Sequence, residues 1–179
     1  EALGLKVGLG LADARARYPS LPVLEADFEA DRRLLEAIAD WCDRYTPLVG
    51  LDAPDGLFLD ITGCAHLFGG EAAMARDLVM RLSHQGFAVR VAVADTVGCA
   101  WAVARYGKAG IVPKGESAAA LMPLPIAALR TEAKIVADLA TSGLKRIEDL
   151  ATRPRAPFAA RFRSEEHTSE LQSLRHLVC

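Results

Sequence analysis

Apolar residues recur at helical spacing in several separate stretches of the chain. In the clearest one, which follows Asp27, the spacing predicts an amphipathic helix that ends near residue 44. Its apolar face consists of Phe28, Leu34, Leu35, Ile38 and Trp41. Glycine and proline interrupt the pattern between stretches and set the limits of each helix. The predicted helices span residues 9–18, 27–44, 71–84, 97–105, 117–121, 131–141 and 146–151.

Strand-like stretches alternate with the first of these helices. Residues 57–62 (LFLDIT) and 87–94 are short and apolar, and the briefer stretches 22–24 and 111–112 have the same character. This alternation predicts an α+β fold with helices on one face of a mixed sheet.

A change of character follows Met122-Pro123-Leu124-Pro125, because two prolines interrupt both helix and strand. The last two predicted helices then flank a tight turn, which is the shape of a helix-hairpin-helix. Such a turn presents backbone N–H groups to a nucleic-acid phosphate. A purely structural helical hairpin is the alternative, and the pattern alone favours it. The candidate DNA-binding residues are Ser142, Gly143, Leu144, Lys145 and Arg146.

Charge and cysteine content exclude several classes of protein. The formal net charge is -2, from 21 Lys plus Arg and 23 Asp plus Glu, so it neither requires nor excludes a nucleic-acid partner. No apolar run approaches the roughly 20 residues of a membrane helix. The four cysteines form no CxxC pair, which argues against a zinc site and a disulfide scaffold.

Three carboxylates near one predicted strand are the only candidates for metal chemistry. Asp52, Asp55 and Asp60 flank residues 57–62, and carboxylates at a strand end are what a magnesium site requires. On spacing alone we favour the alternative that Asp52 and Asp55 are turn-forming residues. The histidines and serines lack the spacing of a hydrolase, and the glycines lack that of a dinucleotide-binding fold.

The end of the chain differs from the rest in composition. Residues 163–173 read RSEEHTSELQS, and their back-translation resembles a sequencing adapter. We therefore expect residues 163–179 to be a non-native tail without function. The chain begins at Glu1 without a methionine, so we expect a fragment, with an apolar strand edge left unpaired.

Several phrases of the chain resemble the Y-family, or DinB/UmuC-like, translesion DNA polymerases. They are Arg44-Tyr45-Thr46-Pro47-Leu48-Val49, Phe58-Leu59-Asp60-Ile61-Thr62-Gly63 and the stretch 86–105. The sequence of residues 60–71 (DITGCAHLFGGE) most resembles the ImuB branch of this family. The resemblance covers residues 1–162. It implies a remnant of the fingers at 1–21, a ferredoxin-like palm at 22–122, and the start of a helical thumb at 123–162.

The resemblance also implies a damaged catalytic site. Active members carry an Asp-Glu pair that binds two magnesium ions together with an aspartate on the first palm strand, which would precede Glu1 here. The pair falls on Asp55 and Gly56, and glycine cannot ligate a metal. The Asn and Lys of a later family phrase fall within residues 95–97 (DTV). We therefore expect no intact catalytic residue and no cofactor. Asp55 is a weak metal candidate, and magnesium is expected only if the protein is an active polymerase.

The function implied by the resemblance is a non-catalytic DNA-repair adaptor in damage-induced translesion synthesis and mutagenesis. Its implied partners are DNA, the sliding clamp, an ImuA-type protein and an error-prone C-family polymerase, the protein partners through regions beyond Phe162. A cytoplasmic location without a membrane segment is implied as well. Two alternatives stay open: an active error-prone polymerase that uses Asp52 or Asp60, and an α+β interaction module without DNA binding.

Overall fold

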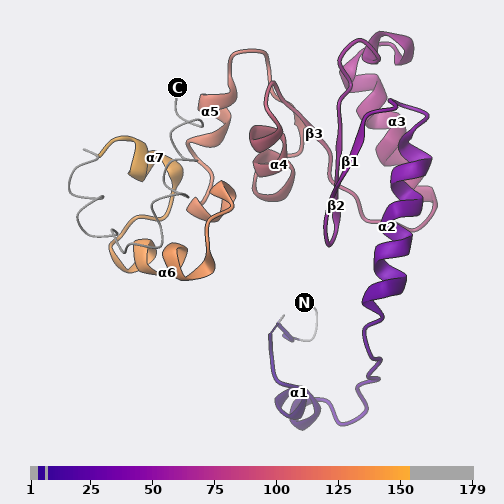
Figure 1. Ribbon diagram of the computed structural model, residues 1–179. Helices are drawn as coiled ribbons and strands as arrows, with labels where there is room; N and C mark the ends of the chain where they lie inside the picture. Colours follow the sequence, from indigo (N-terminus) through magenta and orange to yellow (C-terminus); the bar gives the residue numbers. More distant parts are fainter. Residues whose placement is uncertain (1–3, 7, 154–179) are drawn as a thin grey trace.

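A computed structural model describes residues 4–6 and 8–153 of the chain (Figure 1). The expected non-native tail at 163–179 lies outside these residues. The helices are α1 (Leu11–Arg17), α2 (Phe28–Cys42), α3 (Glu71–His84), α4 (Val97–Tyr106), α5 (Ser117–Leu121), α6 (Ala133–Thr141) and α7 (Ile147–Ala151). Two short 3-10 helices are η1 (Ala65–Phe68) and η2 (Ile126–Leu129). The strands are β1 (Val49–Asp52), β2 (Gly56–Leu59), β3 (Ala92–Val93) and β4 (Gly110–Ile111).

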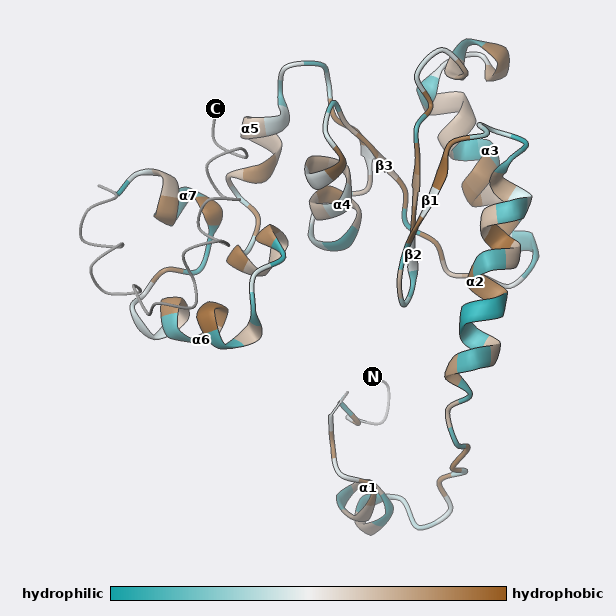
Figure 2. Ribbon diagram, in the orientation of Figure 1, coloured by the Kyte–Doolittle hydropathy of each residue, from teal (hydrophilic) through white to brown (hydrophobic). Residues whose placement is uncertain are grey.

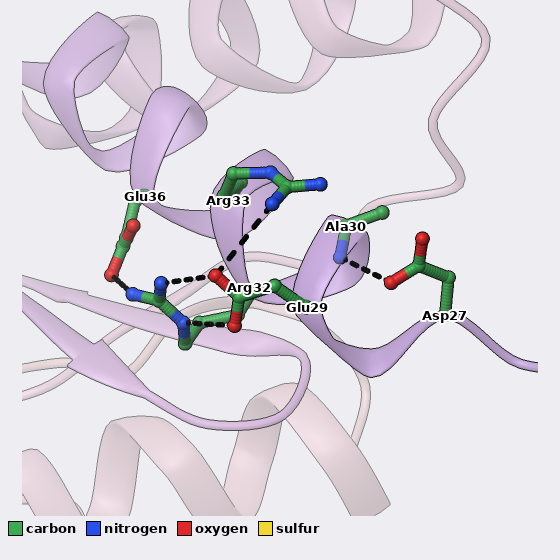
Figure 3. A network of polar contacts seen from close by, with 6 residues as sticks. All are labelled: Asp27, Glu29, Ala30, Arg32, Arg33 and Glu36. Atoms are coloured by element: carbon green, nitrogen blue, oxygen red, sulfur yellow. Dashed lines mark hydrogen bonds and ion pairs between the residues drawn. The ribbon is translucent and has the colours of Figure 1, made fainter.

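The predicted helices are all present, with ends that differ by at most two residues, because their periodicity and caps are local in sequence. Helix α2 begins where Asp27 accepts a hydrogen bond from the Ala30 amide at 2.9 Å (Figure 3). Its N-terminal half is strongly hydrophilic (Figure 2). There Arg32 pairs with Glu29 and Glu36 across successive turns (Figure 3). These pairs support a helix whose first turns lie in solvent.

The strands require a correction. The described residues form two separate two-stranded sheets, one antiparallel (β1 with β2, Asp52 opposite Gly56) and one parallel (β3 with β4). The α+β class is confirmed, while the single mixed sheet is wrong for this part of the chain. Of the predicted strand 87–94 only two residues pair, because apolar alternation favours an extended backbone and cannot supply a neighbouring strand. Residues 22–24 form no strand and link α1 to α2.

Strand β1 was not predicted. It has only four residues, and Gly50 and Asp52 alternate with its two apolar side chains. A stretch of this length carries too little pattern to distinguish a strand from a turn.

Two groups of elements pack around separate apolar clusters. The hairpin unit, which consists of α2, β1, β2, η1 and α3, is centred on Tyr45, Met74, Leu78 and Leu82. The helical unit runs from β3 to α7 and has Cys99, Ala102, Val103, Leu124, Ala128 and Ile147 at its centre, with Ile126, Leu139 and Leu144 forming a smaller cluster under α6. In Figure 1 the two units lie on opposite sides of the extended segment that precedes α4.

That segment belongs to both units. Phe87, Val89 and Val91 pack on the cluster of the hairpin unit, whereas Ala92 and Ala94 pack on that of the helical unit. The units also approach each other where α3 lies beside β3 and β4. The segment 87–94 therefore connects the two cores directly, with no intervening loop between the residues that pack on one core and those that pack on the other.

The proline-rich segment at 122–125 lies inside the helical unit. Leu124 is buried, and its carbonyl accepts a hydrogen bond from the Ile147 amide at 2.9 Å. The Met122 carbonyl accepts one from the Glu148 amide at 3.0 Å. These contacts join the residues before α6 to the start of α7. The domain limits at 21, 122 and 162 stay predictions.

The described residues contain free thiols at Cys42, Cys64 and Cys99. Among the helices of the described residues, none has the length and apolar character needed to cross a membrane.

Candidate functional site: carboxylates and arginines at the hairpin turn

The turn between β1 and β2 brings two of the three candidate carboxylates together. Asp52 is the last residue of β1, and Asp55 lies in the turn directly before β2. Asp60 follows β2 at the other end of the hairpin, where its amide bonds to the Leu48 carbonyl and its side chain accepts from the Thr62 amide at 2.9 Å. The three aspartates therefore do not form one site.

Asp52 is buried and meets three side chains of the helical unit. Its Oδ2 accepts a hydrogen bond from Trp101 Nε1 at 2.7 Å, and its Oδ1 accepts one from Arg130 Nη2 at 2.7 Å. Arg105 Nη2 lies 3.8 Å from Oδ2. With 8% of the residue exposed, the carboxylate depends on these donors to replace lost hydration.

Asp55 is exposed and binds a single arginine through both of its oxygens. Arg105 Nη1 donates to Oδ2 at 3.2 Å, and Nη2 donates to Oδ1. These hydrogen bonds lower the pKa of Asp55 and raise that of Arg105. A fork-to-fork pair of this kind fixes the relative orientation of the two groups.

Trp101 forms the centre of this cluster. The guanidinium carbons of Arg105 and Arg130 lie 5.1 Å and 4.7 Å from the centroid of its ring, within the range of cation–π contacts. The indole thus contacts the Asp52 carboxylate and two guanidinium groups, and Asp55 joins the cluster through Arg105, so the two negative and two positive formal charges cancel. We call these five residues, Asp52, Asp55, Trp101, Arg105 and Arg130, the turn cluster.

The turn cluster does not fit a divalent metal ion. Asp52 and Asp55 already neutralise two arginines, and a cation added there would meet like charge. Gly56 could not be replaced by a ligand without rearrangement, since a Cβ at this position would lie 3.0 Å from both the carbonyl oxygen and Oδ2 of Asp52. Within residues 4–6 and 8–153, no three histidine, cysteine or acidic side chains are placed to hold a metal.

Asp95 and Thr96, where the resemblance places a later motif of the family, have local structural roles. Asp95 accepts a hydrogen bond from the Gly115 amide at 2.7 Å, and the Thr96 hydroxyl accepts one from the Cys99 amide at the start of α4. Both side chains therefore hold turns of the helical unit and lie outside the turn cluster.

The predicted DNA-binding turn joins α6 to α7, with Gly143 in the left-handed conformation at φ 81°. Its amides are satisfied within the chain. Those of Lys145 and Arg146 donate to Asp149 Oδ2 at 2.9 and 2.8 Å, which lowers the pKa of Asp149. The Ser142 and Leu144 amides donate to the Leu139 carbonyl, and the Gly143 amide to that of Ala140.

The contacts of Asp149 limit how a phosphate could bind at this turn. It would have to displace the Asp149 carboxylate to reach the amides of Lys145 and Arg146, whereas the side chains of both residues are exposed. Leu144 is 3% exposed and belongs to the cluster under α6, so it positions the turn from the core side.

A pocket of about 370 Å³ lies beside the turn cluster and shares two of its residues. Trp101, Tyr106, Ala127, Arg130, Thr131, Ala133 and Val136 line it.

Sequence reasoning did not find Trp101, Arg105 and Arg130. Their partners lie 49, 50 and 78 residues away along the chain, so no local pattern marks them. The one available signal was an arginine and a tryptophan four residues apart on an otherwise Ala- and Val-rich helix.

Comparison with known proteins agrees with the family that the sequence motifs resemble and with the observed fold. Residues 1–105 match the family described as IMS: impB/mucB/samB. The chain is 50% identical over 161 residues to Protein ImuB of Caulobacter vibrioides (strain NA1000 / CB15N), covering 89% of this chain and 35% of that protein. It is 31% identical over 101 residues to DNA polymerase IV 2 of Mesorhizobium japonicum, covering 54% of this chain and 23% of that protein.

The fold itself matches a crystal structure of DinB from Sulfolobus solfataricus with a TM-score of 0.76 at 17% sequence identity. That match covers 99% of this chain and 52% of the other. The match covers 35% of each ImuB relative, so the chain spans about a third of their length. The chain belongs to the impB/mucB/samB family and is a homologue of the Y-family DNA polymerases, with ImuB proteins among its relatives.

Proposed function

We propose that this chain is part of a non-catalytic, polymerase-like DNA-repair adaptor that acts in damage-induced translesion synthesis and mutagenesis. In this proposal residues 1–21 are what is present of the fingers, 22–122 form most of the palm and 123–162 begin the thumb. The partners are DNA and, through regions beyond Phe162, the sliding clamp, an ImuA-type protein and an error-prone C-family polymerase.

The observation that carries the proposal is the state of the Asp-Glu position. Asp55 lies in a bidentate ion pair with Arg105, and Gly56 supplies no carboxylate, while a Cβ at its position would lie 3.0 Å from two oxygens of Asp52. Nucleotidyl transfer by two metal ions needs carboxylates that are free to bind them. With one ligand absent and the other paired, the fold supports positioning of partners better than it supports chemistry.

Damage-induced mutagenesis in cells that lack the native gene tests this proposal. Full-length protein should restore mutagenesis, and so should Asp55→Asn, since a non-catalytic adaptor does not need this carboxylate for chemistry. Arg105→Gln is the matched control, because it breaks the same ion pair and keeps the aspartate. If Asp55→Asn abolished mutagenesis while Arg105→Gln supported it, the carboxylate itself would be required and the adaptor proposal would fail.

DNA contact through the turn at 142–146 is the second part of the proposal. Its support is the exposure of the Lys145 and Arg146 side chains on a turn held by Gly143 and Leu144. Because Asp149 already accepts from the two amides, we assign the phosphate contact to the side chains and not to the backbone.

A further inference from the structure

The hairpin unit and the helical unit have separate apolar cores, so contacts between the two units decide how they are oriented. No buried residue belongs to both cores. One connection is the extended segment 87–94 together with the approach of α3 to β3 and β4. The other is the turn cluster, where the turn between β1 and β2 meets α4 and the residue that follows η2.

We infer that Arg105 and Arg130 act as built-in counter-ions that fasten the hairpin turn to the helical unit. They fix the orientation of the two units without a divalent metal ion. This role is independent of whether the full protein binds DNA or its proposed partners.

Asp52 links the hairpin turn to two different elements of the helical unit. A single buried carboxylate accepts hydrogen bonds from α4, through Trp101, and from the segment after η2, through Arg130. Moving the helical unit away would leave the Asp52 charge buried without its donors, unless water entered the gap. The units can therefore separate at this point only if all of these contacts open together.

Arg105 connects the buried and exposed parts of the cluster. It binds Asp55 at the surface of the turn through two hydrogen bonds, and its Nη2 also lies 3.8 Å from Asp52. Both carboxylates of the turn are thereby tied to one side chain of α4.

Arg130 has a backbone conformation that supports the same conclusion. Its φ of 58° places it in the left-handed region, and it is the one non-glycine residue with positive φ within residues 4–6 and 8–153. Side chains adopt this conformation at a cost, which the surrounding contacts must offset. The Arg130 side chain contributes the ion pair with Asp52 and the contact with the Trp101 ring, and its amide donates a hydrogen bond to the Ala127 carbonyl at 3.2 Å.

Distance measurements between two spin labels, one on each unit, test the inference. Nitroxides at Met80→Cys on α3 and Ala137→Cys on α6 occupy exposed positions of the full 179-residue chain, with Cys64 and Cys179 changed to serine. In the parent we expect a narrow distance distribution that neither Mg²⁺ nor a chelator alters. Arg130→Gln and Asp52→Asn should broaden it about twofold or more, because the units gain freedom to swing.

Arg33→Gln is the matched control, since it removes the same charge from an exposed ion pair on α2. Its distribution should equal that of the parent. Asp55→Asn keeps the test decisive if a buried substitution prevents folding, because Asp55 is exposed; it should broaden the distribution to a smaller extent. Equal widths in the parent, Arg130→Gln and Asp55→Asn would overturn the inference, as would narrowing of the parent distribution by Mg²⁺. Neither result depends on the mutagenesis phenotype.

Discussion

Asp52 is the residue at which most polar contacts between the two units converge. Sequence spacing favoured a turn-forming role for Asp52, with a metal ligand as the alternative. In the structure its side chain is buried and accepts hydrogen bonds from Trp101 and Arg130. Its neighbour Asp55 differs in every respect that governs energy: it is exposed, it has one partner, and water can replace that partner. Two aspartates three residues apart therefore contribute unequally to stability.

We expect Asp52→Asn to lower the free energy of unfolding by about 1–3 kcal/mol, because the amide cannot accept from both donors and leaves Arg130 and Trp101 poorly paired. Asp55→Asn should cost less than about 1 kcal/mol. Urea denaturation of the two variants gives the comparison. A larger loss for Asp55→Asn than for Asp52→Asn would contradict the assignment of Asp52 as the central residue.

Acid should weaken the fold through carboxyls whose pKa lies below the ordinary value of 3.8. The pKa of Asp55 is lowered by Arg105, that of Asp77 by Arg81 and then Tyr45, and that of Asp149 by two amides. A lowered folded-state pKa contributes stability that is present above the unfolded value and is lost as pH falls through the folded one. Urea midpoints should be level near neutral pH and decline below about pH 4, where unfolded carboxyls take up protons. A midpoint that rises on acidification would disprove this.

At the scale of elements, the helices were predictable and the sheets were not. Helix α3 begins and ends at the predicted residues because its apolar face and its flanking glycines are local features of the chain. The segment before β3 has equally clear strand character, yet only Ala92 and Val93 pair, since pairing depends on Gly110 and Ile111 reaching them after α4. The turn cluster escaped prediction for the same reason, because contacts across 49 to 78 residues leave no periodic trace.

The β1–β2 hairpin should tolerate a side chain at one of its glycines and not at the other. A Cβ at Gly56 would lie 3.0 Å from two oxygens of Asp52, whereas at Gly50 its nearest neighbour is Phe58 Cβ at 3.9 Å. We expect Gly56→Ala to destabilise the chain by about 1–3 kcal/mol through overpacking. Gly50→Ala, the control in the same hairpin, should stay within about 0.5 kcal/mol of the parent. Thermal or urea unfolding of both variants measures the difference, and equal stabilities would show that Gly56 is not confined by Asp52.

At the scale of the whole molecule, the chain combines a fold of the Y-family polymerases with a turn cluster that fits no metal ion. Its charges are paired inside the chain, and the exposed cations of the α6–α7 turn lie outside that cluster. In the proposed function, the candidate catalytic position and the candidate DNA contact therefore lie on different parts of the chain, so loss of catalysis would not require loss of DNA binding. The resemblance predicted that the family's Asp-Glu pair falls on Asp55 and Gly56, which stays a prediction, while the ion pair between Asp55 and Arg105 became visible only in three dimensions.

DNA binding by the full-length protein should depend on the side chains of Lys145 and Arg146. Changing either to glutamine should weaken binding at all sequences and reduce the slope of log affinity against log salt by about 0.7–0.9, which corresponds to one lost phosphate contact. Fluorescence anisotropy over a range of salt concentrations measures both quantities, with Arg33→Gln as a charge-matched control. An unchanged slope in both variants would remove this turn from the DNA-binding surface.

Primer extension by the full-length protein is the most direct test of the central claim that the palm does not catalyse nucleotide transfer. The reaction contains a primed template, all four nucleotides and either Mg²⁺ or Mn²⁺. We expect no extension above that of an Asp55→Ala variant, because Gly56 offers no metal ligand and the Asp55 carboxylate is paired with Arg105. Template-directed extension that Asp55→Ala abolishes would contradict the account and identify the protein as an active polymerase.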